Sequence, residues 1–204
     1  MAQRGRKKGS DGEASRALLL RIAADEFAEH GYHDTKISTI VRKANVTQPT
    51  FYLYFKSKEA IFEELEDLFR TKLAHLTMGS LVDEKFDDYT AFRRMEERLT
   101  KVLQFFMDHR SLARIGFCIS PSAAEVKTQM AEHIEAQLRE KSTAEHLYPN
   151  VDVGIVASGL VGMIERLALT KLWTGEKTAP ELANNIVTVL LYGLQRNTRV
   201  SSIE

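Results

Sequence analysis

Four side chains capable of hydrogen bonding recur within seven residues of the chain, at Gln48, Thr50, Tyr52 and Tyr54. Glutamine can pair with adenine edges in a major groove, threonine can contact a thymine methyl group, and tyrosine hydroxyls suit phosphates. Basic residues flank the stretch on both sides: Arg42, Lys43, Lys56 and Lys58. This set of side chains is suited to a DNA surface, provided that the chain presents it on one exposed helix face.

The residues around this stretch predict two short helices joined by a tight turn. The first is expected from about Lys36 to Lys43, and it ends at Asn45, since Asn tolerates the positive φ that closes a helix. Thr47 is placed to cap the second helix, and Phe51 and Phe55, four residues apart, face the core. The pattern is that of a helix-turn-helix. Any short helix pair with a tight turn also has apolar residues inside, so the pattern alone leaves a purely structural interpretation open.

The run from Gly31 to Glu59 resembles the N-terminal signature of the TetR family of bacterial transcriptional regulators. The residues in register with that signature are Gly31, Tyr32, Thr35, Ile37, Ile40, Ala44, Val46, Thr47, Thr50, Phe51, Tyr52, Tyr54, Phe55, Ser57, Lys58 and Glu59. Three positions depart from it: Lys36 stands where Thr or Ser is usual, and Asn45 and Pro49 replace glycines.

The resemblance implies a division of labour on the DNA. The base-facing set would be Gln48, Pro49, Thr50 and Tyr52, and the phosphate-binding set Thr35, Thr47, Tyr54 and Lys58. Lys58 has a separate argument, because it begins a helix capped by Ser57, where free N–H groups favour an anion. The basic arm that includes Arg4 and Arg6 could enter a minor groove or could remain a solvated tail.

Charge is divided unevenly along the chain. The 204 residues contain 28 Lys and Arg and 28 Asp and Glu, but residues 1–58 hold 11 basic and 6 acidic ones and residues 59–204 hold 17 and 22. The neutral total is therefore the sum of a net positive charge in residues 1–58 and a net negative charge in residues 59–204. Such a division is expected when only one end of the chain binds a polyanion.

Apolar residues recur at spacings of three and four, with no period-two run, so we predict an all-α chain of about nine helices. Prolines fall at expected helix starts, and S/T-x-x-E capping boxes begin at Ser10, Ser122 and Thr178. Residues 1–58 would form a three-helix DNA-binding domain with its arm. Residues 59–204 would form a larger domain for effector binding and dimerisation, a role that the resemblance implies.

The last two expected helices carry wide apolar faces, and the earlier of these two contains glycines within it. Glycine costs about 1 kcal/mol relative to Ala in a helix, so close approach of another helix is the natural compensation. The resemblance implies pairing with a second copy, through Ile155, Gly159, Leu160, Gly162, Ile186, Val189, Leu190 and Leu194. The alternative is that these residues form the core of a monomer.

The resemblance also implies an apolar effector pocket with a few polar groups. The candidate lining residues are Phe92, Met95, Leu99, Leu103, Phe106, Phe117, Met130, His133, Ile134, Gln137, Met163 and Arg166. For each of them, burial in an ordinary core is the competing interpretation. No His pair has metal-binding spacing and the single cysteine, Cys118, lies between apolar neighbours, so we expect no metal and no cofactor.

Together these features predict a cytoplasmic, homodimeric repressor that binds a palindromic DNA operator and is released by a small, apolar effector. The longest nearly uncharged apolar stretch, Val153 to Ile164, is too short for a membrane span, and no nucleophile–base pair or phosphate loop suggests an enzyme. Two alternatives remain: a DNA-binding regulator controlled by a partner protein, without an effector, and an all-α small-molecule carrier or enzyme.

Overall fold

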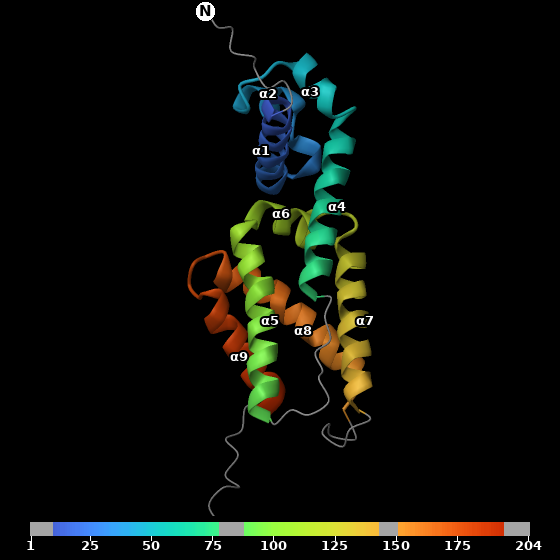
Figure 1. Ribbon diagram of the computed structural model, residues 1–204, viewed down its shortest axis with the longest axis vertical. Coiled ribbons are helices and arrows are strands. Elements are labelled where there is room, and N and C mark those ends of the chain that lie inside the picture. The colour runs from blue at the N-terminus through green and yellow to red at the C-terminus, as the bar shows by residue number, and fades with distance from the viewer. Residues whose placement is uncertain (1–9, 78–87, 143–150, 194–204) are drawn as a thin grey trace, which may run out of the picture. The chain divides into compact units, whose positions relative to one another are not determined.

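The computed structural model describes residues 10–77, 88–142 and 151–193, and all regular structure within them is helical, as predicted. Nine α-helices and two π-helical turns make up this part of the chain (Figure 1). Their bounds are α1 Ser10–Asp34, α2 Ile37–Lys43, α3 Gln48–Tyr54, α4 Lys58–Thr77, α5 Asp88–Asp108, α6 Arg110–Arg114, η1 Ile115–Ile119, α7 Ala123–Ser142, α8 Val153–Leu167, η2 Ala168–Leu172 and α9 Ala179–Tyr192.

The chain divides into two compact units, and the division is not the single cut after residue 58 that the sequence suggested. Unit 1 comprises Met1–Thr71 and Ser111–Ala123, and unit 2 comprises Lys72–Arg110 and Ala124–Glu204. The segment from Ser111 to Ala123 belongs to unit 1 because its η1 turn packs on α1 and on the ring of Phe69 in α4. Helix α4 therefore contributes residues to both units without a break.

The core of unit 1 is built largely from aromatic rings. Phe27 is fully buried, and its ring meets the edge of Phe62 at a centroid distance of 5.0 Å. Phe51 anchors α3 with a ring centroid 5.6 Å from that of Phe55. Asn45 adopts a φ of 53° between α2 and α3, which confirms the predicted turn. The core thus fixes α3 by one face and leaves the other face free.

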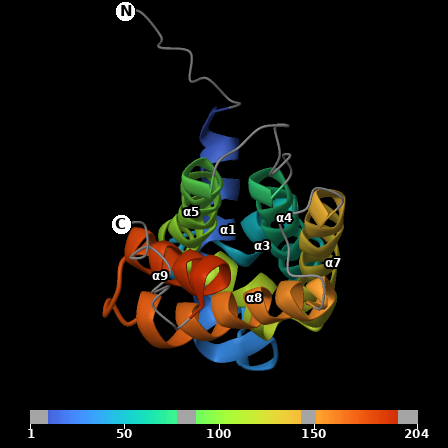
Figure 2. The same cartoon turned by 90° about the horizontal axis from the view of Figure 1, so that it is seen from below.

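In unit 2, α5 lies along α9, and α8 runs across the unit from the side of α9 to the side of α7 (Figures 1 and 2). The indole Nε1 of the buried Trp173 donates to the carbonyl oxygen of Phe106 at 3.0 Å. Lys127 of α7 pairs with Glu165 of α8 at 2.7 Å. These contacts hold α5, α7 and α8 in place around the interior of the unit.

The three predicted capping boxes have different outcomes. Thr178 forms the full reciprocal box with Glu181 at the start of α9, with Pro180 in the first turn. The Ser122 hydroxyl donates to Glu66 at 2.8 Å, and no hydrogen bond joins the described residues Ser122 and Glu125, so the box predicted there was wrong. The side chain of Ser10 lies outside the described residues.

Helix α8 and the π-helical turn η2 form one apolar segment that is longer than the nearly uncharged stretch Val153 to Ile164 noted in the sequence. Val153–Leu172 spans 20 residues with a mean hydropathy of 1.5, which is long and apolar enough to cross a membrane by length and composition. The nearly uncharged stretch in the sequence ends at Ile164, but the apolar helical segment continues past Glu165 and Arg166, so the prediction that it is too short to span a membrane was wrong. Helices of protein cores and interfaces share this composition. Here Ala157, Val161 and Ile164 are buried within unit 2.

Candidate DNA-binding surface and ligand cavity

Helix α3 presents its polar face to solvent because its ends and its inner face are fixed. The Thr47 hydroxyl accepts from the backbone N–H of Thr50 at 3.3 Å, and Pro49 occupies the first turn. Phe51 is fully buried on the inner side. Gln48, Pro49 and Tyr52 are exposed, as base-reading side chains must be.

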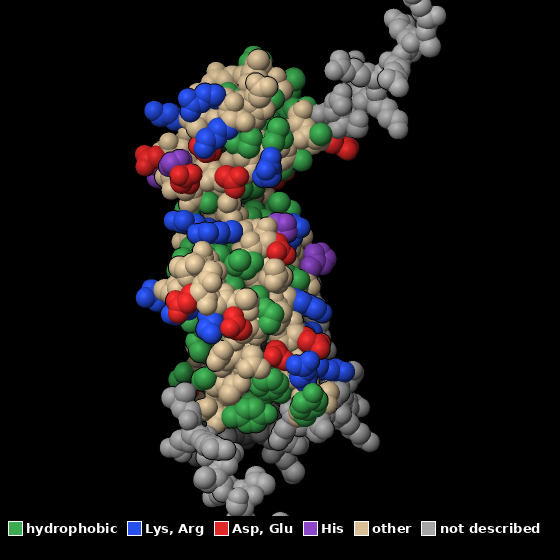
Figure 3. Space-filling model, turned by 90° about the vertical axis from the view of Figure 1, so that its left-hand side faces the viewer, with side chains coloured by type: hydrophobic (Ala, Val, Ile, Leu, Met, Phe, Trp, Pro, Cys, Tyr) green, Lys and Arg blue, Asp and Glu red, His purple; other side chains and the backbone are tan. Residues whose placement is uncertain are grey.

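Residues next to this face add to the candidate surface. Leu53, which the sequence analysis left out, is the most exposed large apolar side chain of α3, at 79%. The sequence does not single out Leu53, because its neighbours in the chain are polar side chains. Lys36, Arg42 and Lys56 are exposed, and basic side chains gather at the α2–α3 end of unit 1, at the top of Figure 3. This end of the unit is suited to a phosphate backbone.

Thr35 does not belong to the phosphate-binding set. It is 2% exposed, and its hydroxyl donates to the carbonyl oxygens of Gly31 at 2.8 Å and Glu26 at 3.1 Å. The hydroxyl therefore donates to carbonyl groups of the last part of α1 and is used within the unit. A phosphate cannot reach it without unfolding this corner.

Lys58 is also used inside the unit rather than presented to an anion. Its Nζ donates to the carbonyl oxygens of Tyr32 at 2.8 Å, Thr35 at 3.1 Å and His33 at 3.3 Å. The same ammonium lies 4.4 Å from the centre of the Tyr32 ring. A cation is favoured at the negative end of a helix, so Lys58 locks the end of α1 onto the start of α4.

The neighbouring pair Tyr32 and Glu59 strengthens this junction. The Tyr32 hydroxyl donates to Glu59 at 2.5 Å. Burial, together with this hydrogen bond, raises the pKa of Tyr32 to about 12. The Tyr32 hydrogen bond is the main reason why the pKa of Glu59 falls from 4.5 to about 2. Glu59 is thus ionised at neutral pH and serves as an acceptor.

Three further members of the predicted DNA set have limited structural description. Tyr54 is partly exposed at the end of α3. Arg4 and Arg6 lie outside the described residues. Of the phosphate-binding set, Thr47 and Tyr54 remain predictions; the Thr47 hydroxyl already caps α3 and lies 2.8 Å from that of Thr50.

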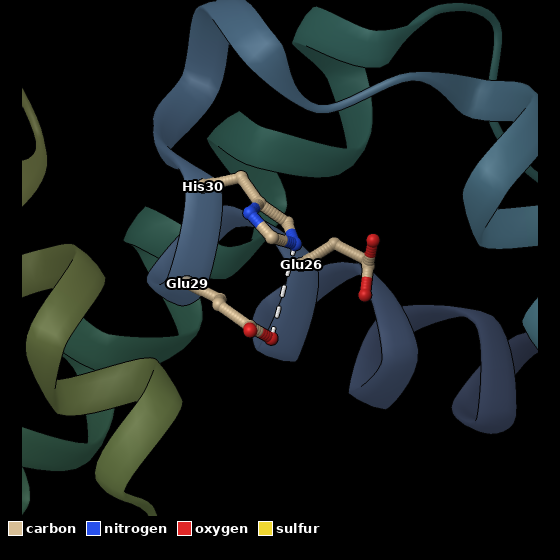
Figure 4. Close-up of side chains that lie close together, drawn as sticks. All are labelled: Glu26, Glu29 and His30. Carbon is tan, nitrogen blue, oxygen red and sulfur yellow. Dashed lines mark ion pairs between the residues drawn. The ribbon is translucent and has the colours of Figure 1, made fainter.

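One group of metal-ligand residue types occurs on α1, at Glu26, Glu29 and His30 (Figure 4). His30 Nε2 lies 3.8 Å from Glu29, and candidate ligand atoms of all three residues lie within 4.8 Å of one another. The sequence search missed the group because it looked for histidine pairs. Glu26 is 1% exposed and forms an ion pair with Lys43. Since that lysine already neutralises the buried carboxylate, we assign no metal to the group.

Unit 2 contains a cavity of about 220 Å³ between its helices. The predicted residues that line it are Met95, Leu99, Met130, His133, Ile134 and Gln137. The lining residues that the sequence analysis missed are Leu76, Thr77, Arg98, Val102, Leu138, Val151, Val153, Val156, Leu160, Ile164, Val187, Leu190 and Leu191. All of them belong to unit 2.

Six predicted pocket residues do not line the cavity: Phe92, Leu103, Phe106, Phe117, Met163 and Arg166. Phe117 belongs to unit 1, where it packs on Phe69. Phe106 is fully buried against Trp173, and Phe92 stacks on Tyr192. Leu103 is likewise core, while Met163 and Arg166 lie on α8 without contributing to the lining.

The polar groups of the cavity come from three helices. His133 Nε2 on α7 lies 3.2 Å from the carbonyl oxygen of Thr77 and 2.6 Å from Gln137 Nε2. Arg98 on α5 contributes a positive charge, and burial followed by the nearby charge of Arg94 lowers its pKa. The cavity is otherwise apolar, which is typical of a small-molecule site.

The predicted dimer residues fall into four groups. Ile155, at 72%, and Val189, at 41%, are exposed with Gly159 and Gly162, and a methyl group added to either glycine would meet nothing within 4 Å. Leu160 and Leu190 line the cavity instead. Ile186 is 2% exposed and so has little surface left for a partner. Leu194 lies outside the described residues.

Comparisons with known proteins agree with this architecture. The family model "Bacterial regulatory proteins, tetR family" matches residues 19–65. The "Uncharacterized HTH-type transcriptional regulator YdgC" of Bacillus subtilis (strain 168) is 39% identical over 185 residues, which cover 91% of this chain and 95% of that protein. The "Fatty acid metabolism regulator protein" of the same organism is 24% identical over 189 residues, or 86% and 93% of the two chains.

Solved structures show the same fold. The TetR family transcriptional regulator PfmR from Thermus thermophilus superposes with a TM-score of 0.69 at 24% identity, over 87% of this chain and 99% of that one. The fold and the sequence likeness define a helix-turn-helix regulator of transcription. The chain belongs to the TetR family of bacterial transcriptional regulators.

Proposed function

We propose that the protein is a ligand-responsive repressor that binds a palindromic operator as a homodimer and is released by a small, largely apolar effector. The observation that carries the proposal is the cavity of about 220 Å³, whose lining includes Leu76 and Thr77 at the end of α4. The same helix begins at Lys58, four residues after α3 ends. A ligand that displaces one end of α4 acts on a helix joined closely to the DNA-reading residues.

Dimerisation through α8 and α9 is supported by their exposed faces. Only 22% of the most apolar stretch of α8 and η2 is buried within the described chain, although its composition suits a protein interior. Two exposed glycines, Gly159 and Gly162, would let another helix approach closely. In such a dimer each α3 would enter one major groove, with half-sites about 34–36 Å apart.

The competing functions are less well supported. A regulator controlled only by a partner protein has no need of an apolar cavity inside unit 2. For a carrier or an enzyme, the exposed face of α3 with Gln48 and Tyr52 would have no purpose. We therefore infer that the protein is a regulator without enzymatic activity. It would act in the compartment that contains its operator DNA.

The first experiment selects fragments of genomic DNA that the purified protein retains, and then measures the affinity for the selected operator. Gln48→Ala is expected to weaken specific binding by about 1–3 kcal/mol and to leave binding to unrelated DNA nearly unchanged. Lys56→Ala is the matched control, because loss of a phosphate contact weakens both kinds of binding alike. Equal losses for Gln48→Ala on both kinds of DNA would show that Gln48 reads no base.

A further inference from the structure

Arg98 introduces a permanent positive charge into a cavity wall that is otherwise almost entirely apolar. Among the described residues, the lining contains one arginine, one histidine and no aspartate or glutamate. Within the described part of the chain, the Arg98 guanidinium has no hydrogen-bonding or ion-pair partner, and its one charged neighbour of note is Arg94, which repels it. A guanidinium stays protonated at any physiological pH, so this charge cannot be relieved by losing a proton.

This arrangement is unfavourable in the empty protein. A cation that is partly removed from water loses hydration, and here neither a carboxylate nor a hydrogen bond from the described residues compensates for the loss. Other arginines of α5 do not share this condition: Arg93, on the solvent side, pairs with Glu96 at 2.7 Å. A hydrophobic residue at position 98 would complete the apolar wall without such a cost.

We propose that the effector is an anionic amphiphile, with an apolar body that fills the cavity and a carboxylate or phosphate head that pairs with Arg98. The inference rests on the proposed ligand-responsive function and specifies the chemistry of its ligand. Arginine binds both oxyanions through paired N–H donors, and such charge-assisted bonds are stronger where water is excluded.

The size of the cavity bounds the apolar body. An apolar cavity of about 150 Å³ in another protein holds benzene. The 220 Å³ here is moderately larger, so an unbranched chain of about ten carbons is a suitable probe.

The ligand experiment compares four ten-carbon probes by calorimetry on the full-length protein: decanoate, decyl phosphate, decanol and decyltrimethylammonium. Decanoate or decyl phosphate is expected to bind roughly ten- to hundredfold more tightly than decanol, and the cationic probe is expected to bind most weakly. The first two arms distinguish a carboxylate from a phosphate head. Equal affinity for decanoate and decanol, or binding of none of the probes, would overturn the proposal.

Substitutions assign the preference to one side chain. Arg98→Met should abolish the preference for decanoate over decanol, and Arg98→Lys should retain part of it. Arg93→Gln, on the exposed side of the same helix, should leave the preference unchanged. Arg98→Met should also raise the melting temperature of the ligand-free protein, since it removes an uncompensated charge. If Arg98→Met keeps the full preference for decanoate and the wild-type melting temperature, the selectivity comes from another residue of the cavity.

Measuring the release of operator DNA by decanoate and by decanol tests the ligand chemistry and the ligand-responsive function separately. If decanoate binds through Arg98 but leaves the operator complex intact, the ligand chemistry stands and release by an effector fails. If decanol releases the operator as effectively as decanoate does, release stands and the anionic preference fails.

Discussion

Gly116 lies directly against the ring of Phe69: a Cβ atom built on this glycine would be 2.1 Å from Phe69 Cδ1. Phe69 is fully buried, so its ring has no open space into which it can move. Gly116→Ala should therefore destabilise the protein by about 1–3 kcal/mol through overpacking. Urea unfolding measures the change.

The double variant Gly116→Ala with Phe69→Leu distinguishes a clash from a simple change of helix propensity. The smaller side chain should recover part of the stability lost in Gly116→Ala, because the two residues are in contact and their effects are coupled. Strictly additive losses would contradict the packing explanation.

Lys58 should behave as a structural lysine. Lys58→Met removes donors to three carbonyl oxygens and is expected to cost about 1.5–3 kcal/mol of unfolding free energy. The salt dependence of operator binding should stay as in the wild type. Lys56→Met, at an exposed neighbouring position, should change stability by less than about 0.5 kcal/mol and reduce the salt slope by about 1. The reverse pattern would return Lys58 to the phosphate-binding set.

The Tyr32–Glu59 hydrogen bond predicts a pH dependence in the acid range. Because the pKa of Glu59 is lower in the folded protein than the ordinary 4.5, its contribution to stability is present above 4.5 and is lost as the pH falls toward 2. Tyr32→Phe should therefore destabilise the protein at neutral pH, and the difference from the wild type should narrow below 4.5.

An NMR titration of the Glu59 carboxyl carbon checks this directly. Its pKa should rise part of the way toward 4.5 in Tyr32→Phe, since the Ser57 hydroxyl and a backbone N–H still donate to it. Tyr89→Phe, at a side chain that is 70% exposed, serves as the control. An unchanged pKa in Tyr32→Phe would show that the shift has another cause.

The two exposed glycines of α8 give opposite predictions for a monomer and a dimer. In an isolated chain, Gly159→Ala and Gly162→Ala should each stabilise the helix by about 1 kcal/mol, since each has open space around it. If a second copy packs there, the added methyl groups should instead raise the dissociation constant of the dimer.

Sedimentation equilibrium over a range of concentrations measures that constant. Thr128→Ala, on the exposed side of α7, raises helix propensity without altering α8 and should leave it unchanged. If the dissociation constant of the dimer falls or stays unchanged in both glycine variants, the interface does not include this face of α8.

The helix-turn-helix could be predicted from the sequence because its determinants are local. Asn45 in the turn, Thr47 at the cap and Phe51 on the inner face each act within a few residues of their position. The hydrogen-bond partners of Thr35 and Lys58 could not be predicted from the sequence. The donor groups of these side chains suit a phosphate and also suit the carbonyl oxygens near the end of α1. Only the path of the chain decides between these partners.

The cavity was predicted in part, for a reason visible in α5. Its apolar stripe is wide, and periodicity does not reveal which edge of the stripe faces a void. Met95 and Leu99 face the cavity, whereas Phe106 turns toward Trp173. Arg98 was missed because the prediction followed the apolar residues of this helix, and their periodicity does not single out a charged residue beside them. The unit boundary was missed because the contact of Phe69 with Phe117 joins segments 48 residues apart.

Every described residue that lines the cavity belongs to unit 2, whereas Gln48, Tyr52 and the rest of α3 belong to unit 1. Substitutions that retune the cavity therefore leave the chemistry of α3 untouched, and changes in α3 leave the cavity as it was. If the protein is the ligand-responsive repressor proposed above, natural variation can exchange one inducer for another while the same genes stay under control. An engineer can use the same separation to build biosensors that share a single promoter.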